Sequence, residues 1–238
     1  MTRFSIALIA VFFIISLGCQ KNKEMGEEVS IAKKYAKYRV SVYKEKELKT
    51  WMATLEKAED VSLLSEESYT DNKGRSKEIS KIKLADDSVG YIESRHLADT
   101  PIVFTTNTKA FVRPTSGSRI FATIPKGELG FIIGEKGLWV QIYVGKIKDK
   151  NVTQQWVEGG YISDANVVLE AKQYALALSA LEDKDSEKRS NAEKIFEDLS
   201  NGSSVIAEMA KEKLIELGKN YDLNTEEPSM KDEDYYNQ

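Results

Sequence analysis

An internal repeat constrains the fold of this chain more than any other feature of its sequence. Residues 52–65 read MATLEKAEDVSLLS and residues 121–134 read FATIPKGELGFIIG, so that Ala, Thr, Lys and Glu coincide and the apolar positions stay in register. The tripeptide Gly-Tyr-Ile at 90–92 recurs at 160–162, at almost the same offset along the chain. Two matches at nearly one offset indicate two copies of a single fold.

Each copy has the residue pattern of a small all-β unit. Short runs rich in Val, Ile, Tyr and Thr alternate with Gly, Asp, Asn and Pro, as in closely spaced antiparallel strands. We assign the copies to residues 36–98 and 108–168. Residues 99–107 are expected to be the linker between them, because Pro101 would interrupt a helix there.

The second copy allows a more detailed prediction of its interior. Side chains alternate between the two faces of a strand, so Val140, Ile142 and Val144 are expected to line the inner face. Gly127 follows a lysine at the point where a turn requires a positive φ, which glycine adopts at no steric cost. Residues 145–155 are expected to form a polar hairpin that the first copy lacks.

Four motifs follow one another in the second copy. They are Ala110-Phe111-Val112-Arg113-Pro114, Ile124-Pro125-Lys126-Gly127, Leu138-Trp139-Val140-Gln141-Ile142 and Gly159-Gly160-Tyr161-Ile162. In this order they resemble the bacterial Src-homology-3 (SH3) domain, a five-stranded barrel common in exported proteins. The first copy keeps the order, but Ala58 replaces the turn glycine and the tryptophan of the fourth strand is missing. The resemblance implies two small SH3-like β-barrels in tandem.

After the second copy the apolar period becomes helical. Stripes of Ala, Val, Ile, Leu, Phe and Met at helical spacing predict a three-helix segment within residues 169–220. Residues 221–238 are acidic, lack periodicity and contain Pro228, which predicts a disordered tail. The expected fold class is therefore mainly β with a C-terminal α segment.

An apolar run at residues 4–17 precedes the only cysteine of the chain, Cys19. As a helix this run would rise about 21 Å, which is short of a hydrocarbon core of about 30 Å. Arg3 precedes the run, and Gly18 with Cys19 closes it, as in a secretory signal peptide with a small-residue cleavage site. We assign the signal peptide to residues 1–18.

The residues around the cleavage point, Ser16-Leu17-Gly18-Cys19, resemble the lipobox of bacterial lipoproteins, in the relaxed form of spirochaetal lipoproteins. The resemblance implies that Cys19 becomes the first residue and carries fatty acids such as palmitate. Two or three acyl chains make membrane attachment effectively permanent. Residues 19–35 would then be a lipidated tether, and the protein is expected in the cell envelope, at the outer membrane. The alternative is an ordinary signal peptide that ends at a small residue.

The composition excludes several kinds of partner and chemistry. A formal net charge of -4 makes nucleic acid a poor partner. One histidine, His96, and one cysteine cannot build a His/Cys metal site, and a lipidated Cys19 cannot serve as a nucleophile. His96 is expected to be a surface or barrel-end residue. We therefore predict no cofactor, no metal and no enzymatic activity.

Aromatic residues of the second copy are the remaining candidates for a ligand-binding surface. Trp156, Tyr143 and Tyr161 could line a groove for a peptide or glycan, because aromatic side chains offer an apolar face and a polar edge. Trp156 is the first choice, since it follows the polar hairpin, whereas Trp139 is expected to be core. The alternative is that all of these aromatic residues form barrel core and rim.

Three function classes remain. The first is a membrane-anchored binding module for an envelope glycan, peptide or protein, of which a surface adhesin for host components is one form. The second is a structural or assembly scaffold of the envelope. The third is an enzyme such as a cell-wall hydrolase. It is the least expected, because two barrels and three helices leave no room for a catalytic domain.

Overall fold

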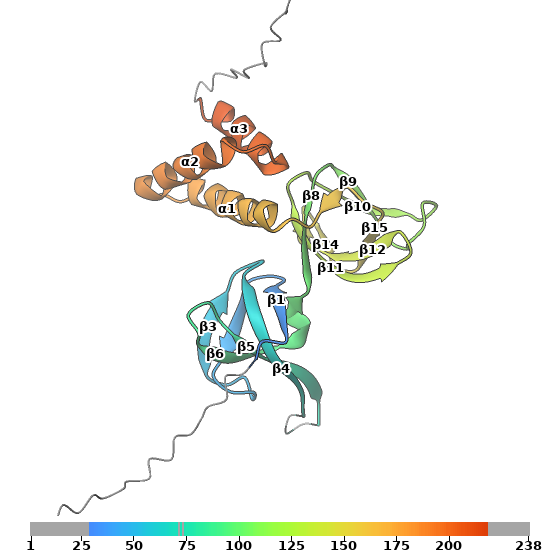
Figure 1. The fold of residues 1–238 in the computed structure, drawn as a ribbon. Helices are drawn as coiled ribbons and strands as arrows, with labels where there is room; N and C mark the ends of the chain where they lie inside the picture. Colours follow the sequence, from blue (N-terminus) through green and yellow to red (C-terminus); the bar gives the residue numbers. More distant parts are fainter. Residues whose placement is uncertain (1–28, 71, 73, 219–238) are drawn as a thin grey trace, which may run out of the picture.

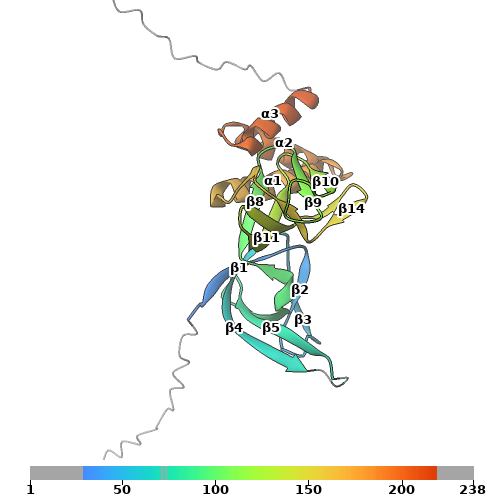
Figure 2. The ribbon, with the colours of Figure 1, turned by 90° about the vertical axis from the view of Figure 1, so that its right-hand side faces the viewer.

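The computed structural model describes residues 29–70, 72 and 74–218. The predicted signal peptide, Cys19 and the acidic tail 221–238 lie outside the described residues. Within them the chain is mainly β and ends in three helices, as the sequence predicts. Two β-units lie one above the other, and the helices pack beside the second unit (Figures 1 and 2).

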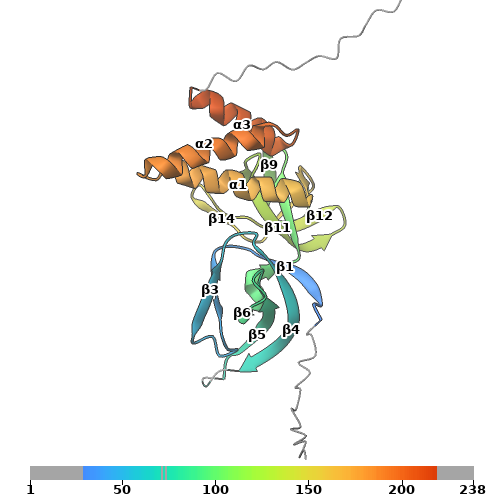
Figure 3. The same cartoon turned by 60° about the vertical axis from the view of Figure 1, so that its left-hand side comes forward.

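The first β-unit is one seven-stranded antiparallel sheet, strongly curved in Figure 3. Its strands are β1 (Ala32–Ala36), β2 (Val40–Tyr43), β3 (Trp51–Leu55), β4 (Asp60–Thr70), β5 (Ser76–Lys83), β6 (Val89–Glu93) and β7 (Leu97–Ala98). They are arranged in the order β3-β2-β6-β5-β4-β1-β7. A single turn of 3-10 helix, Ser94–His96, joins the last two strands.

The second β-unit repeats this arrangement. Its strands are β8 (Thr100–Phe104), β9 (Thr108–Phe111), β10 (Ile120–Ile124), β11 (Leu129–Lys136), β12 (Trp139–Tyr143), β15 (Gln155–Val157) and β16 (Tyr161–Ile162). Their order, β10-β9-β15-β12-β11-β8-β16, is that of the first sheet with each strand replaced by its counterpart. The small hairpin of β13 (Gly145–Ile147) and β14 (Lys150–Val152) is the additional element that residues 145–155 were expected to form.

One of the two sequence matches does not join equivalent strands. Tyr91 lies in β6, in the middle of the first sheet, whereas Tyr161 lies in β16, the last strand of the second sheet. The counterpart of Tyr91 is Trp156 in β15. The longer β4–β5 hairpin of the first unit and the extra hairpin of the second change the offset, so the Gly-Tyr-Ile match is a coincidence of sequence.

Both units begin earlier than the sequence analysis placed them. β1 lies almost entirely within the expected tether 19–35, and β8 lies within the expected linker 99–107. Ile102, Val103 and Phe104 of β8 are completely buried. The prediction of a linker at Pro101 is wrong. A proline interrupts a helix, but it is tolerated near the first residue of a strand, and Pro101 is the second residue of β8.

The apolar residues form three clusters. One fills the first unit, around Val42 and Ile82, and a second fills the second unit, around Phe104 and Ile142. Val140, Ile142 and Val144 are all buried, as predicted. The third cluster joins Ala58 and Phe131 of the two units to the helices. Complete burial of a large apolar side chain, such as those of Ile82, Ile142 and Phe131, stabilises the fold by about 1.5–3 kcal/mol.

The helices are α1 (Ala165–Leu181), α2 (Ser186–Ser200) and α3 (Val205–Glu216), stacked against one another in Figure 3. Asp164, Asp185 and Ser204 cap their N-termini by accepting hydrogen bonds from backbone N–H groups of the first turn. Among the described residues, no helix combines the length and apolar character needed to cross a membrane.

Helix α3 also contacts the predicted glycine turn of the second unit. Lys126 forms an ion pair with Glu208 at 2.8 Å. Gly127 has a φ of +80°, as predicted, and a Cβ there would lie 2.2 Å from the Met209 sulfur. In the first unit Ala58 occupies the equivalent turn with a φ of 59°, so the left-handed turn persists without its glycine.

Candidate ligand-binding face

A row of large side chains crosses four neighbouring strands of the second unit. The row consists of Ile120 in β10, Phe111 in β9, Trp156 in β15 and Gln141 in β12, each in register with the next. Their strand neighbours Ala110, Ile142 and Val157 are buried. Because successive side chains point to opposite faces, the row lies on the outer face of the sheet. We call it the outer row of the second unit.

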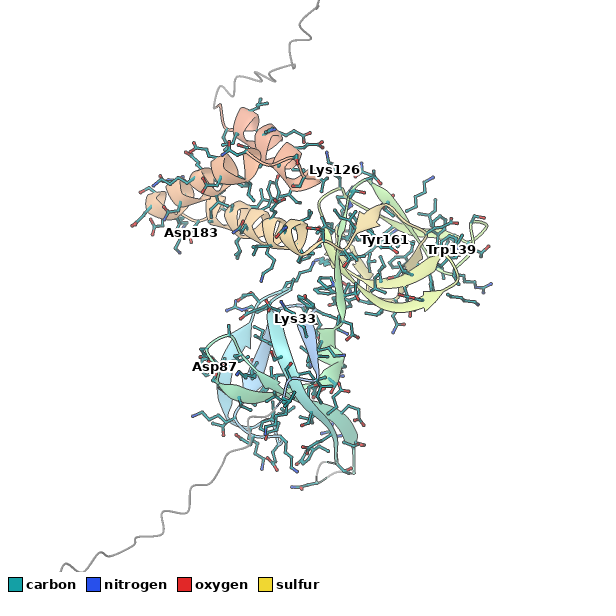
Figure 4. All side chains as sticks on the ribbon, in the orientation of Figure 1. Lys33, Asp87, Lys126, Trp139, Tyr161 and Asp183 are labelled. Atoms are coloured by element: carbon teal, nitrogen blue, oxygen red, sulfur yellow. The ribbon has the colours of Figure 1, made fainter. Side chains whose placement is uncertain are left out.

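Trp139 extends this row rather than the core. It is half-buried, and its ring meets that of Phe111 edge to face, with 5.4 Å between the centroids. Leu138, at the adjacent turn, is 79% exposed and Ile120 is 46% exposed. Figure 4 shows Trp139 at the end of the second unit that is farther from the helices. The expectation that Trp139 is core is therefore wrong.

The first unit has a row at the equivalent positions. It consists of Trp51 in β3, Tyr43 in β2, Tyr91 in β6 and Lys81 in β5, again in register. Trp51 is 60% exposed. We call it the outer row of the first unit. Sequence reasoning missed it, because the misaligned Gly-Tyr-Ile match concealed that Tyr91 and Trp156 are counterparts.

A shallow hollow of about 310 Å³ adjoins the outer row of the second unit. Phe111, Lys109 and Glu158 line it together with Thr106, Asn107 and Thr108. Gly160 closes the hollow with a φ of +77°, and a Cβ there would lie 2.3 Å from the Thr108 hydroxyl oxygen. The hollow thus combines an aromatic ring, two charges of opposite sign and the hydroxyl groups of Thr106 and Thr108.

The structure does not bring the three predicted ligand-binding residues together. Trp156 lies in the outer row. Tyr143 is turned toward the first unit, where its ring lies 5.7 Å from the Tyr38 ring and 5.5 Å from the Lys37 ammonium. Burial raises the pKa of the Tyr143 hydroxyl. Trp156 is therefore the one of the three that belongs to the partly exposed outer row of the second unit.

Tyr161 packs against the core of the second unit. Its ring contacts the buried Phe104 edge to face, with 6.4 Å between the centroids. Burial is also the main reason that the pKa of Tyr161 is raised. In Figure 4 Tyr161 lies closer to the helices than Trp139 does.

His96 is half-buried at the end of the first unit next to the second. Its Nδ1 shares a hydrogen bond with the Tyr38 hydroxyl, and its Nε2 lies 3.8 Å from the Glu93 carboxylate. Burial lowers the pKa of His96, and although Glu93 opposes this effect, Arg95 and nearby lysines add to it. Tyr38 also contacts Tyr143, so the histidine supports the junction between the units.

A second hollow lies where the two β-units meet the helices. This junction cleft has a volume of about 360 Å³ and is lined by side chains that include Lys57, Leu129, Tyr174 and Met209. It is mostly apolar, and Leu176 of α1 leaves 59% of its surface exposed at its edge.

Comparison with known sequences identifies one family. A sequence model of the family described as Lipoprotein LenA matches residues 5–222. That range includes both β-units, all three helices and Cys19. No curated protein matches the chain.

Two solved structures show a weak similarity. They are NlpC2 and NlpC1 from Trichomonas vaginalis, each 12% identical to this chain, with TM-scores of 0.25 and 0.24. The matches cover 64% and 65% of this chain but 57% and 55% of those proteins, so the chain spans a little over half of their length. Scores this low establish no common fold.

Proposed function

From the premise that this chain belongs to the lipoprotein LenA family, we propose that it is a non-enzymatic, membrane-anchored envelope protein that binds a ligand through its second β-unit. The outer row around Trp156 is the observation that carries this proposal. Large aromatic side chains at partly exposed, neighbouring positions are typical of binding surfaces. The ligand would be an envelope glycan, peptide or protein, or a host component if the protein is displayed at the cell surface.

Anchoring would depend on lipid attached to Cys19, with the outer membrane as the expected location. The family match supports this anchor, because residues 5–222 include all but the first residue of the apolar run and the whole lipobox-like tetrapeptide. We expect Cys19→Ala to move the protein from the membrane fraction to the soluble fraction. Unchanged membrane attachment of the variant, after a high-salt wash that removes bound partners, would contradict lipidation at Cys19.

We propose that both β-units are SH3-like. The support is the common strand order of two small antiparallel sheets, together with the motifs of the second copy. We also propose that the protein has no enzymatic activity, because both ring nitrogens of His96 already face protein groups. Its ring is held between Tyr38 and Glu93 at the junction of the two units.

An assembly scaffold is the second candidate function. It is favoured by the junction cleft, whose apolar lining continues into the exposed Leu176 of α1. Such a surface would dock another envelope protein instead of a ligand of the outer row.

Capture from envelope and host extracts separates the two candidates. The full chain is compared with Trp156→Ala and with Leu176→Ala, since both replace a partly exposed apolar side chain. We expect the first variant to lose its captured component and the second to retain it. The opposite result would favour the scaffold, and dependence on neither residue would reject both surfaces.

A further inference from the structure

The second β-unit differs from the first in how its positive charges are paired. Residues 100–164 contain eight Lys or Arg and five Asp or Glu. Among the described residues, the ion pair between Lys126 and Glu208 of α3 is the one that involves a cation of this unit. In the first unit, by contrast, most cations face a carboxylate of that unit, as in the pairs Lys33–Asp60 at 2.9 Å and Arg39–Glu56 at 3.1 Å.

Four cations of the second unit surround its outer row. Lys109 lies two residues before Phe111 in β9 and on the same face, and Lys136 is the strand partner of Trp139. Arg113 and Arg119 lie at the two ends of the loop between β9 and β10, beside Phe111 and Ile120. All four are exposed. The aromatic row therefore has cations at both ends and beside it.

We infer that the outer row of the second unit binds an acidic polysaccharide, an inference that rests on the binding function proposed above. The rings of Phe111, Trp139 and Trp156 offer flat apolar surfaces to the C–H faces of sugar rings. The neighbouring Lys and Arg side chains would pair with the carboxylate groups that recur along such a polymer, and arginine does so with two parallel hydrogen bonds.

The hollow beside Phe111 favours a sugar over an acidic peptide. Glu158 has no ion-pair partner among the described residues, and it lies beside Lys109 and the hydroxyl groups of Thr106 and Thr108. A carboxylate repels other carboxylates but accepts hydrogen bonds from hydroxyl groups. Sugar hydroxyls would satisfy Glu158 while the acidic groups of the same polymer reach the surrounding cations.

The open edge of the sheet gives a second reason to favour a polysaccharide over a peptide. A peptide can add to an edge strand through backbone hydrogen bonds, and β10 is the edge nearest the outer row. Lys150 of the additional hairpin donates a hydrogen bond to the Phe121 carbonyl of β10 and lies over the Phe121 ring. Lys150 thus takes one backbone acceptor of this edge, which disfavours strand addition there and favours recognition through the side chains of the outer row.

Binding of polygalacturonate, a linear polymer of uronic acid, tests the inference. The full chain in detergent is titrated with polygalacturonate, with neutral dextran and with polyglutamate, at low salt and at about 1 M salt, where the screening length falls to about 3 Å. We expect binding of polygalacturonate alone, with the affinity reduced at high salt.

Two pairs of substitutions locate the site. Replacing both Arg113 and Arg119 by Gln should weaken polygalacturonate binding about tenfold, which corresponds to the loss of two exposed charge contacts. The matched control replaces Arg39 and Lys46, two exposed cations that are paired within the first unit, and should change affinity less than about twofold. Circular dichroism checks that all variants remain folded.

The outcomes separate this inference from the function on which it rests. Equal binding of polyglutamate, or equal loss in both pairs of variants, would overturn the assignment to a polysaccharide at the outer row. If no polymer binds while capture from extracts still depends on Trp156, the ligand is not an acidic polysaccharide, but the proposed binding function stands. If capture does not depend on Trp156 either, both are wrong.

Discussion

The two β-units have the same backbone and different surfaces. Both sheets have one strand order, and both carry an irregularity at the same point of the fourth strand, next to Leu63 in one and Ile132 in the other. Both also have a left-handed residue in the equivalent turn, Ala58 and Gly127. The repeat therefore preserves the interior and the exceptional backbone positions.

The surfaces of the two units differ mainly in charge. The first unit neutralises many of its cations internally, and its Lys37 and Tyr38 contact Tyr143 of the second unit. Within the part of the chain that the structure describes, the cations around the outer row of the second unit have no carboxylate partner. This unit also adds a hairpin near its edge. Since the fold is common to both units, a function specific to one of them must depend on these surface differences.

The largest expected effect tests whether the interiors are equivalent. Ile82 and Ile142 are both completely buried and occupy equivalent positions of β5 and β12. Replacing either by Ala should lower the free energy of unfolding by about 2–5 kcal/mol. Denaturant unfolding of each variant measures this loss. A loss below about 1 kcal/mol in one unit alone would show that the two cores are not equivalent.

A smaller effect is expected at the equivalent turns. Gly127→Ala should lower the free energy of unfolding by more than about 1 kcal/mol, because its φ is +80° and Met209 occupies the space of the new methyl group. Ala58→Gly relieves the strained φ but removes a buried methyl group, so the two contributions nearly cancel, to within about 0.5 kcal/mol. Equal losses at both positions would contradict this account of the turns.

The junction should respond to pH through His96. Burial lowers the pKa of His96 below 6.5, so the fold favours the neutral ring. The corresponding stability is present above about pH 6.5 and is lost as the pH falls toward the lowered value. Urea unfolding at pH 7.5 and at lower pH measures how the free energy of unfolding changes with pH. His96→Gln should make that dependence weaker.

A neighbouring carboxylate contributes in a different pH range. Burial raises the pKa of Glu93, but the hydrogen bond from Lys77 and the charge of Arg95 outweigh burial and lower it below 4.5. Its contribution is therefore present above about pH 4.5 and is lost only in stronger acid. If His96→Gln leaves the pH dependence of the free energy of unfolding unchanged between about pH 7 and 5.5, His96 is not the group that makes stability depend on pH in this range.

Much of the fold was predictable from the sequence, because it follows from local patterns. Alternation identified the inner side of β12, and helical spacing identified the three helices. The start of each unit was not predictable, since Pro101 is compatible with both a linker and the start of a strand. The burial of β8 distinguishes these possibilities, and burial depends on the complete sheet.

The candidate site was predictable only in part. The sequence predicts Trp156 at the surface, Trp139 in the core and Tyr143 in the binding site, whereas the structure has Trp139 beside Trp156 on the outer face and Tyr143 at the junction. Strand alternation places Trp139, Gln141 and Tyr143 on one face, while the distinction between exposed row and junction arises from the packing of the first unit on Tyr143. Contacts between distant segments carry no local signal in the sequence.

The central claim is that the outer row of the second unit binds ligand and that of the first unit does not. The direct measurement is the amount of component captured from envelope and host extracts by the full chain and by two matched variants, Trp156→Ala and Tyr91→Ala. These residues are counterparts in β15 and β6, and both are half-buried. Our account predicts that capture is lost in Trp156→Ala and retained in Tyr91→Ala. Equal loss in both variants, or capture that depends on Tyr91 alone, would contradict it.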